Sequence, residues 1–92
     1  MAITVELPSA LRPYAGGSTE VRLDGCGTVG EALCRLAGLH AGVTDRVMDE
    51  RGAVRQHVNI FVDGESIRFL DGLRTPLQPA STIAIVPAVS GG

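Results

Sequence analysis

Short stretches in which apolar and polar side chains alternate are the strongest constraint on how this chain folds. Residues 3–7 and 19–23 alternate in this way, and a period of two is typical of strands that bury one face. Pro8 follows the first stretch, and the Gly16-Gly17 pair marks a tight turn before the second. We therefore expect two strands joined as a hairpin.

One amphipathic helix is predicted after the hairpin. Thr28 followed three residues later by Glu31 matches a capping box, in which both side chains satisfy backbone N–H groups at the start of a helix. Apolar residues then recur at helical spacing, so the helix is expected over residues 28–40. Residues 42–48 are expected to add a short helical turn, and residues 49–56 an exposed polar loop.

The second half of the chain predicts further strands. Residues 58–62 alternate, and Asp63-Gly64 is a favoured pair for a two-residue hairpin turn. Ile67 and Phe69 indicate a returning strand, and the apolar run over residues 82–86 indicates a buried last strand.

The order of these elements predicts an α+β fold. A mixed sheet of about five strands packed on one main helix is the β-grasp, or ubiquitin-like, arrangement. In it the first and last strands pair in parallel at the sheet centre, so the last strand directs the C-terminus beyond the sheet. We expect one domain over residues 1–89 and a flexible C-terminal tail over residues 90–92.

Composition argues against several classes of function. The formal net charge is −2 with acidic and basic residues interspersed, which offers no basic patch to nucleic acid or to an anionic membrane. The longest apolar run, residues 83–89, is too short to cross a bilayer. The two cysteines lack disulfide-framework or metal-site spacing. These features predict a cytoplasmic protein without a bound cofactor or metal.

The basic residues are all arginine, eight in number, and none is lysine. Codon bias in a GC-rich genome is one explanation. The other is chemical, because a protein that carries an activated C-terminal acyl group gains from lacking ε-amines that would accept that group.

The ending Pro87-Ala88-Val89-Ser90-Gly91-Gly92 is the strongest functional feature. Glycines lack a Cβ atom, so the last two residues can pass through a narrow channel and bring the terminal carboxylate to a nucleotide. The alternative is an ordinary frayed terminus. The predicted β-grasp order favours the functional interpretation.

Other candidate motifs have simpler explanations. Residues 25–30 match the dinucleotide fingerprint G-x-G-x-x-G, but the alternating strand before them favours a turn and a helix cap. His40 and His57 stand apart from any cluster with ligand spacing. Cys34 is expected to pack at the edge of the helix's apolar face, and Cys26 to be accessible in a loop.

Phe61 is a candidate docking residue. Alternation places it on the sheet face opposite the buried side chains of its strand, where no second layer is predicted. Arg68 is expected to share that outer face. The alternative for Phe61 is partial burial under a loop.

Several segments together resemble a known family. They are Leu11-Arg12-Pro13-Tyr14 with Gly16-Gly17, Val58-Asn59-Ile60-Phe61-Val62, Ile67-Arg68-Phe69 and the Gly-Gly ending. Nearly the whole chain is similar to the ubiquitin-like sulfur carriers of the MoaD/ThiS/CysO family, and these segments look closest to the CysO type.

The resemblance implies that an E1-like enzyme of the MoeB/ThiF type adenylates Gly92 with ATP, after which sulfide or a persulfide yields a terminal thiocarboxylate. It further implies that Gly91 provides the extended passage and that Ser90 and Val89 begin the docking segment. A sulfur-accepting synthase, either a cysteine synthase or a thiosugar synthase, would then take the sulfur, and a metalloprotease would release cysteine. The alternatives are a ubiquitin-like modifier or interaction module and, on residues 25–30 alone, a small nucleotide-binding enzyme.

Overall fold

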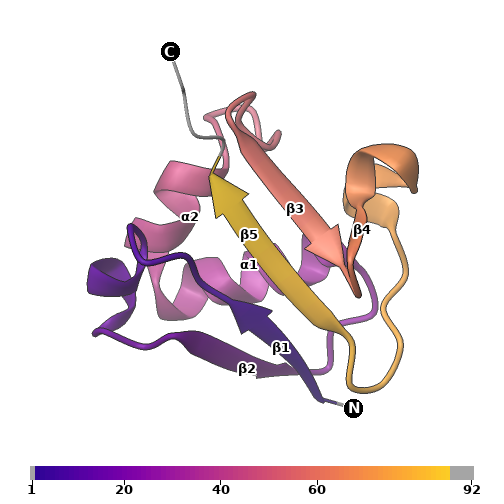
Figure 1. Cartoon of the computed structure of the whole chain (residues 1–92), viewed down its shortest axis with the longest axis horizontal. Helices are drawn as coiled ribbons and strands as arrows, with labels where there is room; N and C mark the ends of the chain where they lie inside the picture. Colours follow the sequence, from indigo (N-terminus) through magenta and orange to yellow (C-terminus); the bar gives the residue numbers. More distant parts are fainter. Residues whose placement is uncertain (1, 88–92) are drawn as a thin grey trace.

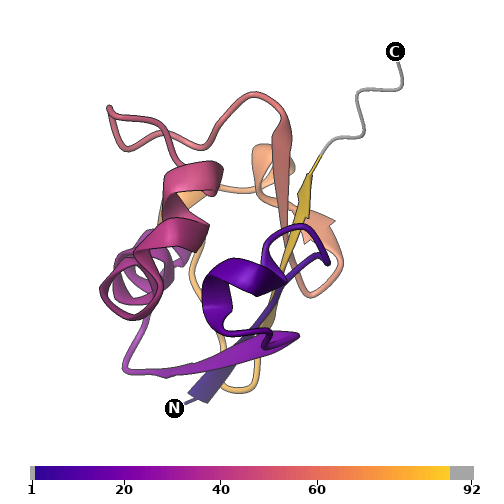
Figure 2. The ribbon, with the colours of Figure 1, turned by 90° about the vertical axis from the view of Figure 1, so that its left-hand side faces the viewer.

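The computed structural model describes residues 2–87, and residues 1 and 88–92 lie outside the described part. A single twisted sheet forms one layer, and the helices cover one of its faces (Figures 1 and 2). The expected boundary between domain and tail, at residues 89 and 90, lies outside the described residues and stays a prediction.

Five strands make up the sheet: β1 (Ala2–Glu6), β2 (Glu20–Asp24), β3 (Val58–Val62), β4 (Glu65–Ser66) and β5 (Thr82–Pro87). Their order across the sheet is β2-β1-β5-β3-β4. β1 and β5 are parallel neighbours, with Val5 opposite Ile83, and the other pairs are antiparallel. The predicted β-grasp topology is confirmed.

The helical layer consists of α1 (Val29–Leu39) and α2 (Ala41–Val47), and a 3-10 helix, η1 (Arg12–Ala15), follows β1. The first bond of the predicted capping box is present, since the Thr28 Oγ1 accepts the N–H of Glu31 at 3.2 Å. The return bond differs from the prediction, because the Glu31 carboxylate accepts the N–H of Gly27, one residue before the N-cap, at 2.6 Å. The predicted short helical turn after the main helix is also confirmed, as α2.

The core lies between the sheet and the helices and is aliphatic, because the chain has only three aromatic residues and none of them is buried. Side chains that alternate along the strands meet side chains at helical spacing from α1 and α2. The most deeply buried are Ile3, Val5, Val29, Leu36, Val43, Val47, Ile60 and Ile83. This packing fixes β5 at the centre of the molecule.

A returning strand is present, but the prediction that Ile67 and Phe69 belong to it is wrong. β4 ends at Ser66, and residues Ile67–Phe69 form a 3-10 helix, η2. The Ser66 hydroxyl accepts the N–H of Arg68 at 3.3 Å, and this local bond turns the chain out of the strand. A second 3-10 helix, η3 (Gly72–Arg74), follows.

Candidate functional site

The end of β5 is the described part of the chain that leads to the predicted functional tail. Ile83 and Ile85 anchor the strand in the core, and Pro87 ends it opposite Val58 of β3. Val86, on the outer face, is 43% exposed. The strand therefore leaves the sheet from a rigid and central position, which we call the exit end.

The predicted tail residues Gly92, Gly91, Ser90 and Val89 lie outside the described residues. Their roles accordingly stay predictions, and the structure contributes the geometry of the scaffold that precedes them.

A hollow of about 440 Å³ lies beside the exit end. β1, β2 and β5 line it, together with the segment that follows β1. On its rim Glu6 and Glu20 stand directly opposite each other across the β1–β2 pair. Like charges at opposite positions destabilise a sheet slightly, and Arg12, which lines the same hollow, adds a positive charge beside them. Sequence reasoning missed the rim, because the register of β1 and β2 decides that the two carboxylates meet.

Phe61 lies in β3, between Ala84 of β5 and Ser66 of β4. Its side chain is half-buried, and its backbone neighbours on both sides are strands. A docking role for Phe61 stays a prediction.

Arg68 does not sit on a strand beside Phe61, contrary to expectation. It belongs to η2, and its Nη2 donates to the carbonyl oxygens of Gln56 and Val58, each at 3.2 Å. Because β4 pairs only with Phe61 and Val62, the first half of β3 forms a free edge there. Arg68 covers part of that edge, which would otherwise offer unpaired carbonyl groups to another strand.

The loop over residues 25–30 is a turn and a helix cap. The Thr28 hydroxyl accepts the N–H of Glu31 in the first turn of the helix, and the Glu31 carboxylate accepts the N–H of Gly27 just before the helix. A Cβ atom built on Gly30 would come within 3.1 Å of the carbonyl oxygen of Leu73, so this glycine serves close packing of α1 against η3. These contacts explain the glycine pattern without a nucleotide.

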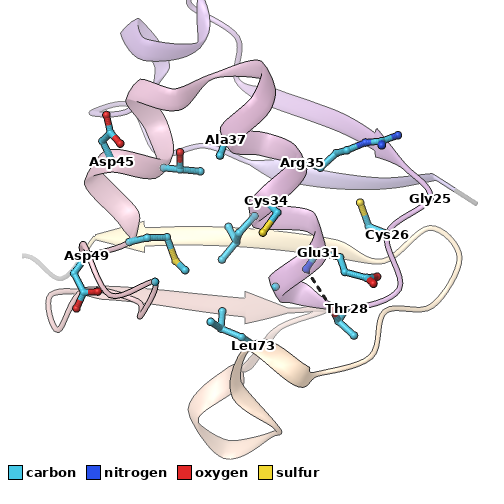
Figure 3. A pocket seen from close by; sticks show the side chains of 15 residues that line it. Gly25, Cys26, Thr28, Glu31, Cys34, Arg35, Ala37, Asp45, Asp49 and Leu73 are labelled. Atoms are coloured by element: carbon cyan, nitrogen blue, oxygen red, sulfur yellow. Dashed lines mark hydrogen bonds between the residues drawn. The ribbon is translucent and has the colours of Figure 1, made fainter.

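A broader groove of about 850 Å³ runs along the helical face, between α1, α2 and Leu73 (Figure 3). Both cysteines line it, but their environments are the reverse of those expected. Cys26 is buried, and Cys34 is exposed. Burial raises the pKa of the Cys26 thiol, the nearby Arg35 partly opposes this, and Glu31 and Asp24 add to the rise.

Metal ligands do not gather in this part of the molecule. Within residues 2–87 no group of three or more His, Cys, Asp or Glu side chains could hold a metal ion. Within the same residues no helix is long and apolar enough to cross a membrane.

Comparison with known proteins places this scaffold in a family. Residues 5–92 match the ThiS family, which is nearly the whole chain. The chain belongs to the ThiS family. The sulfur carrier protein CysO of Mycobacterium tuberculosis is 37% identical to it over 94 residues, with both chains fully covered. The resemblance inferred from the sequence is confirmed.

Solved structures of related proteins share the fold of this ThiS-family chain. A chain in the crystal structure of the Amycolatopsis orientalis BexX/CysO complex superposes with a TM-score of 0.89 at 34% identity, covering 98% of this chain and 99% of that one. The small archaeal modifier protein SAMP1 of Haloferax volcanii gives 0.85 at 33% identity with both chains fully covered. The relatives are thus described as sulfur carriers and as small modifiers.

Proposed function

We propose that this ThiS-family chain is a sulfur carrier whose working group is the carboxylate of Gly92. The observation that carries the proposal is the full-length match to the family and to CysO, which extends through the Gly-Gly ending. The chain acts as a co-substrate for partner enzymes and performs no catalysis of its own.

The activation chemistry uses ATP bound by an E1-like enzyme of the MoeB/ThiF type. A carboxylate oxygen of Gly92 attacks the α-phosphorus, and pyrophosphate leaves. Sulfide then attacks the acyl carbon, and AMP leaves with the bonding electron pair. The resulting thiocarboxylate is a strong nucleophile.

The scaffold supports this chemistry by presenting the end of the chain. β5 is paired with β1 over residues 82–84 and with β3 over residues 83–87, so the segment beyond Pro87 starts from a strand that is held by β3 up to its last residue. Gly91 and Gly92 lack side chains that would obstruct a narrow enzyme channel. Ser90 and Val89 begin the segment that the partner binds.

The acceptor is a synthase that takes sulfur from the thiocarboxylate, either a cysteine synthase or a thiosugar synthase. For the cysteine route, a metalloprotease releases the product. The support is that a related CysO was crystallised in a complex with another protein, BexX.

Intact-mass measurement tests the proposal. The chain is incubated with an E1-like enzyme, ATP and sulfide, and it should gain the mass difference between sulfur and oxygen. Deletion of Gly92 should abolish the gain, whereas Leu39→Ala, on the helical layer, should leave it unchanged. A wild-type chain that keeps its original mass while the same enzyme charges an authentic CysO would refute the proposal.

A ubiquitin-like modifier is the second candidate, favoured by the likeness to SAMP1. In that case Gly92 would form an isopeptide bond with a lysine of another protein. Incubation with the activating enzyme and a cell extract distinguishes the two, because a modifier appears in higher-mass protein adducts and a carrier as a thiocarboxylate.

A further inference from the structure

β2 is an edge strand whose outer side is unpaired. It lies at one end of the strand order, next to β1 alone, and forms the lower edge of the sheet in Figure 1. No other segment of residues 2–87 makes a backbone–backbone hydrogen bond with the outer side of β2. Such a row of free N–H and carbonyl groups is a template for a further strand.

The pairing with β1 decides which backbone groups of β2 face outward. The N–H of Leu7 donates to the carbonyl of Thr19 at 2.9 Å, so Thr19 and every second residue after it direct their backbone groups toward β1. The backbone groups of Glu20 and Arg22 therefore point away from the sheet. Each of these two residues keeps a donor and an acceptor on the open edge.

The side chains on this edge are exposed and alternate in charge. Glu20, Arg22 and Asp24 lie on the sheet face that the helices leave uncovered, and the residues between them are buried toward the core. Neither Glu20 nor Arg22 takes part in a salt bridge within residues 2–87. Glu20 also stands opposite Glu6 of β1, so a cation on its free side would relieve the repulsion between the two carboxylates.

The charge pattern favours a second copy of β2 in one antiparallel register. Charged side chains protect an edge when they repel an approaching strand, and a two-fold axis at Arg22 would indeed set like charges opposite each other. A two-fold axis at Val21 instead sets Glu20 of each copy opposite Arg22 of the other. These are the residues with outward backbone groups, so each such pair exchanges both N–H···O bonds and joins opposite charges across the strands.

A two-fold axis at Leu23 also brings opposite charges together, Arg22 against Asp24, but it fits the edge less well. The carbonyl of Asp24 already receives the thiol of Cys26, whose Sγ lies 3.7 Å away. The chain then turns at Gly25, with φ of 75°, so the strand ends where this register needs it to continue.

We propose that β2 pairs with β2 of a second copy of this chain, antiparallel about Val21, and forms a symmetric dimer. The two five-stranded sheets then join into one continuous sheet. The two-fold axis reverses the direction of β5, so the two exit ends lie at opposite ends of the joined sheet and do not obstruct each other. The inference is independent of the proposed function, because it uses only the edge and its charges.

Sedimentation equilibrium tests whether the dimer forms. The wild-type chain is kept reduced, so that the exposed Cys34 cannot form a disulfide. The concentration series extends to about 1 mM, because an interface of one strand pair belongs to the small and weak class. The apparent mass should rise from that of one chain toward that of two. A chain that stays monomeric throughout would overturn the inference and leave the edge open to a strand of a different protein.

Charge reversal tests the register. Glu20→Arg and Arg22→Glu each set like charges opposite in both symmetric pairs, so each variant alone should dimerise roughly 10-fold more weakly than the wild type, or worse. An equimolar mixture of the two variants should associate as the wild type does, because the arginines of one chain then face the glutamates of the other. Asp24→Asn is the matched control, since it removes a charge from the same edge outside the proposed pairs and should leave association unchanged. A dimer that tolerates both reversals, or a mixture that stays monomeric, would overturn the proposed pairing.

Amide hydrogen exchange tests the backbone pairing. The N–H of Arg22 should exchange more slowly as the fraction of dimer rises, whereas the N–H of Val21, which faces β1, is protected already in the monomer and serves as the reference. Unchanged exchange at Arg22 in a dimeric sample would show that the copies meet elsewhere and would overturn the inference. Thermal unfolding of each variant at the wild-type temperature shows that the fold is intact.

Discussion

Cys26 and Cys34 show how a single turn sets the chemistry of a side chain. Gly25 adopts a positive φ of 75°, and Cys26 then turns inward, with its Sγ 3.7 Å from the carbonyl oxygen of Asp24. Hydrophobic periodicity cannot predict the burial of Cys26, because this residue lies in the turn between β2 and α1. Cys34 falls at the boundary of the apolar stripe of α1, where a small rotation of the helix decides between burial and exposure.

The two thiols should therefore react at different rates. Only the thiolate attacks a disulfide reagent, and both burial and the raised pKa keep the Cys26 thiol protonated at neutral pH. With Ellman's reagent the native chain should release one equivalent quickly, from Cys34. Cys34→Ser should remove this fast phase and Cys26→Ser should preserve it; a fast phase that survives in Cys34→Ser would contradict the assignment.

Asp49 organises the loop that follows α2. Its carboxylate accepts the N–H of Arg51 at 2.9 Å and that of Ala53 at 3.0 Å. The hydrogen bond from Ala53 is the main cause of a lowered pKa, to which the Arg51 bond and the charges of Arg51 and Arg55 contribute. A lowered pKa in the folded state means that the ionised form stabilises the fold.

This contribution has a defined pH window. It is fully present above the pKa of an aspartate in the unfolded chain, about 3.9, and is lost as the pH falls through the lower folded-state value. Asp49→Asn should lower the urea midpoint at pH 7, and the gap from the wild type should narrow at acidic pH. A gap of constant size from pH 7 to pH 3 would rule out the titration of Asp49 as its cause.

Among the elements, α1 is the one that sequence reasoning described best. The signals at its start are local, since the Thr28 and Glu31 side chains bond to backbone groups within four residues. Its apolar face is equally readable, because buried residues recur at helical spacing. Such elements are predictable because their signals lie within a few residues of one another and do not depend on contacts with distant parts of the sequence.

Thr28 should contribute measurably to stability through this cap. Thr28→Ala leaves the N–H of Glu31 without its side-chain acceptor and should cost about 1 kcal/mol in the free energy of unfolding, measured by urea denaturation. Thr28→Ser keeps the hydroxyl and is the matched control. Equal losses in both variants would show that the methyl group, and not the hydrogen bond, is responsible.

The segment after β3 shows where local reasoning fails. The turn at Asp63-Gly64 was predicted correctly, and both residues have positive φ values, 49° and 90°. Two apolar residues, Ile67 and Phe69, were too few to separate a strand from a 3-10 helix. The decision depends on Ser66, which caps η2, and on Arg68, which reaches back to β3.

At the scale of the whole molecule, the β-grasp topology followed from the order of elements and the buried last strand. What the order could not supply was the register, and with it the meeting of Glu6 and Glu20. It also did not reveal that Phe69 stays exposed, because exposure results from tertiary packing. Phe69, which is 86% exposed, has no signature in the sequence beyond being an aromatic residue in a turn-rich segment.

The absence of lysine is a whole-molecule property with a chemical consequence. Apart from the amino terminus, the surface offers no aliphatic amine to an acyl adenylate. Charging with the activating enzyme and ATP, without sulfide, should therefore yield no ladder of self-conjugates on a denaturing gel. Arg74→Lys, at an exposed position, should introduce a dimer band that intensifies as the pH rises toward the lysine pKa of about 10.4. A ladder from the wild-type chain would contradict the prediction.

The central position of β5 also determines when the protein can fold during its synthesis. β1 and β3 are joined only through this strand, which begins at Thr82 and is the last to be synthesised of the five. A nascent chain on the ribosome cannot close the sheet until β5 has emerged, because contacts of such long sequence separation form late. A product that stops short of Thr82 would leave β1 and β3 each with an open strand edge. Cellular proteases would remove such a product, so the folded protein consists of chains that were translated at least through β5.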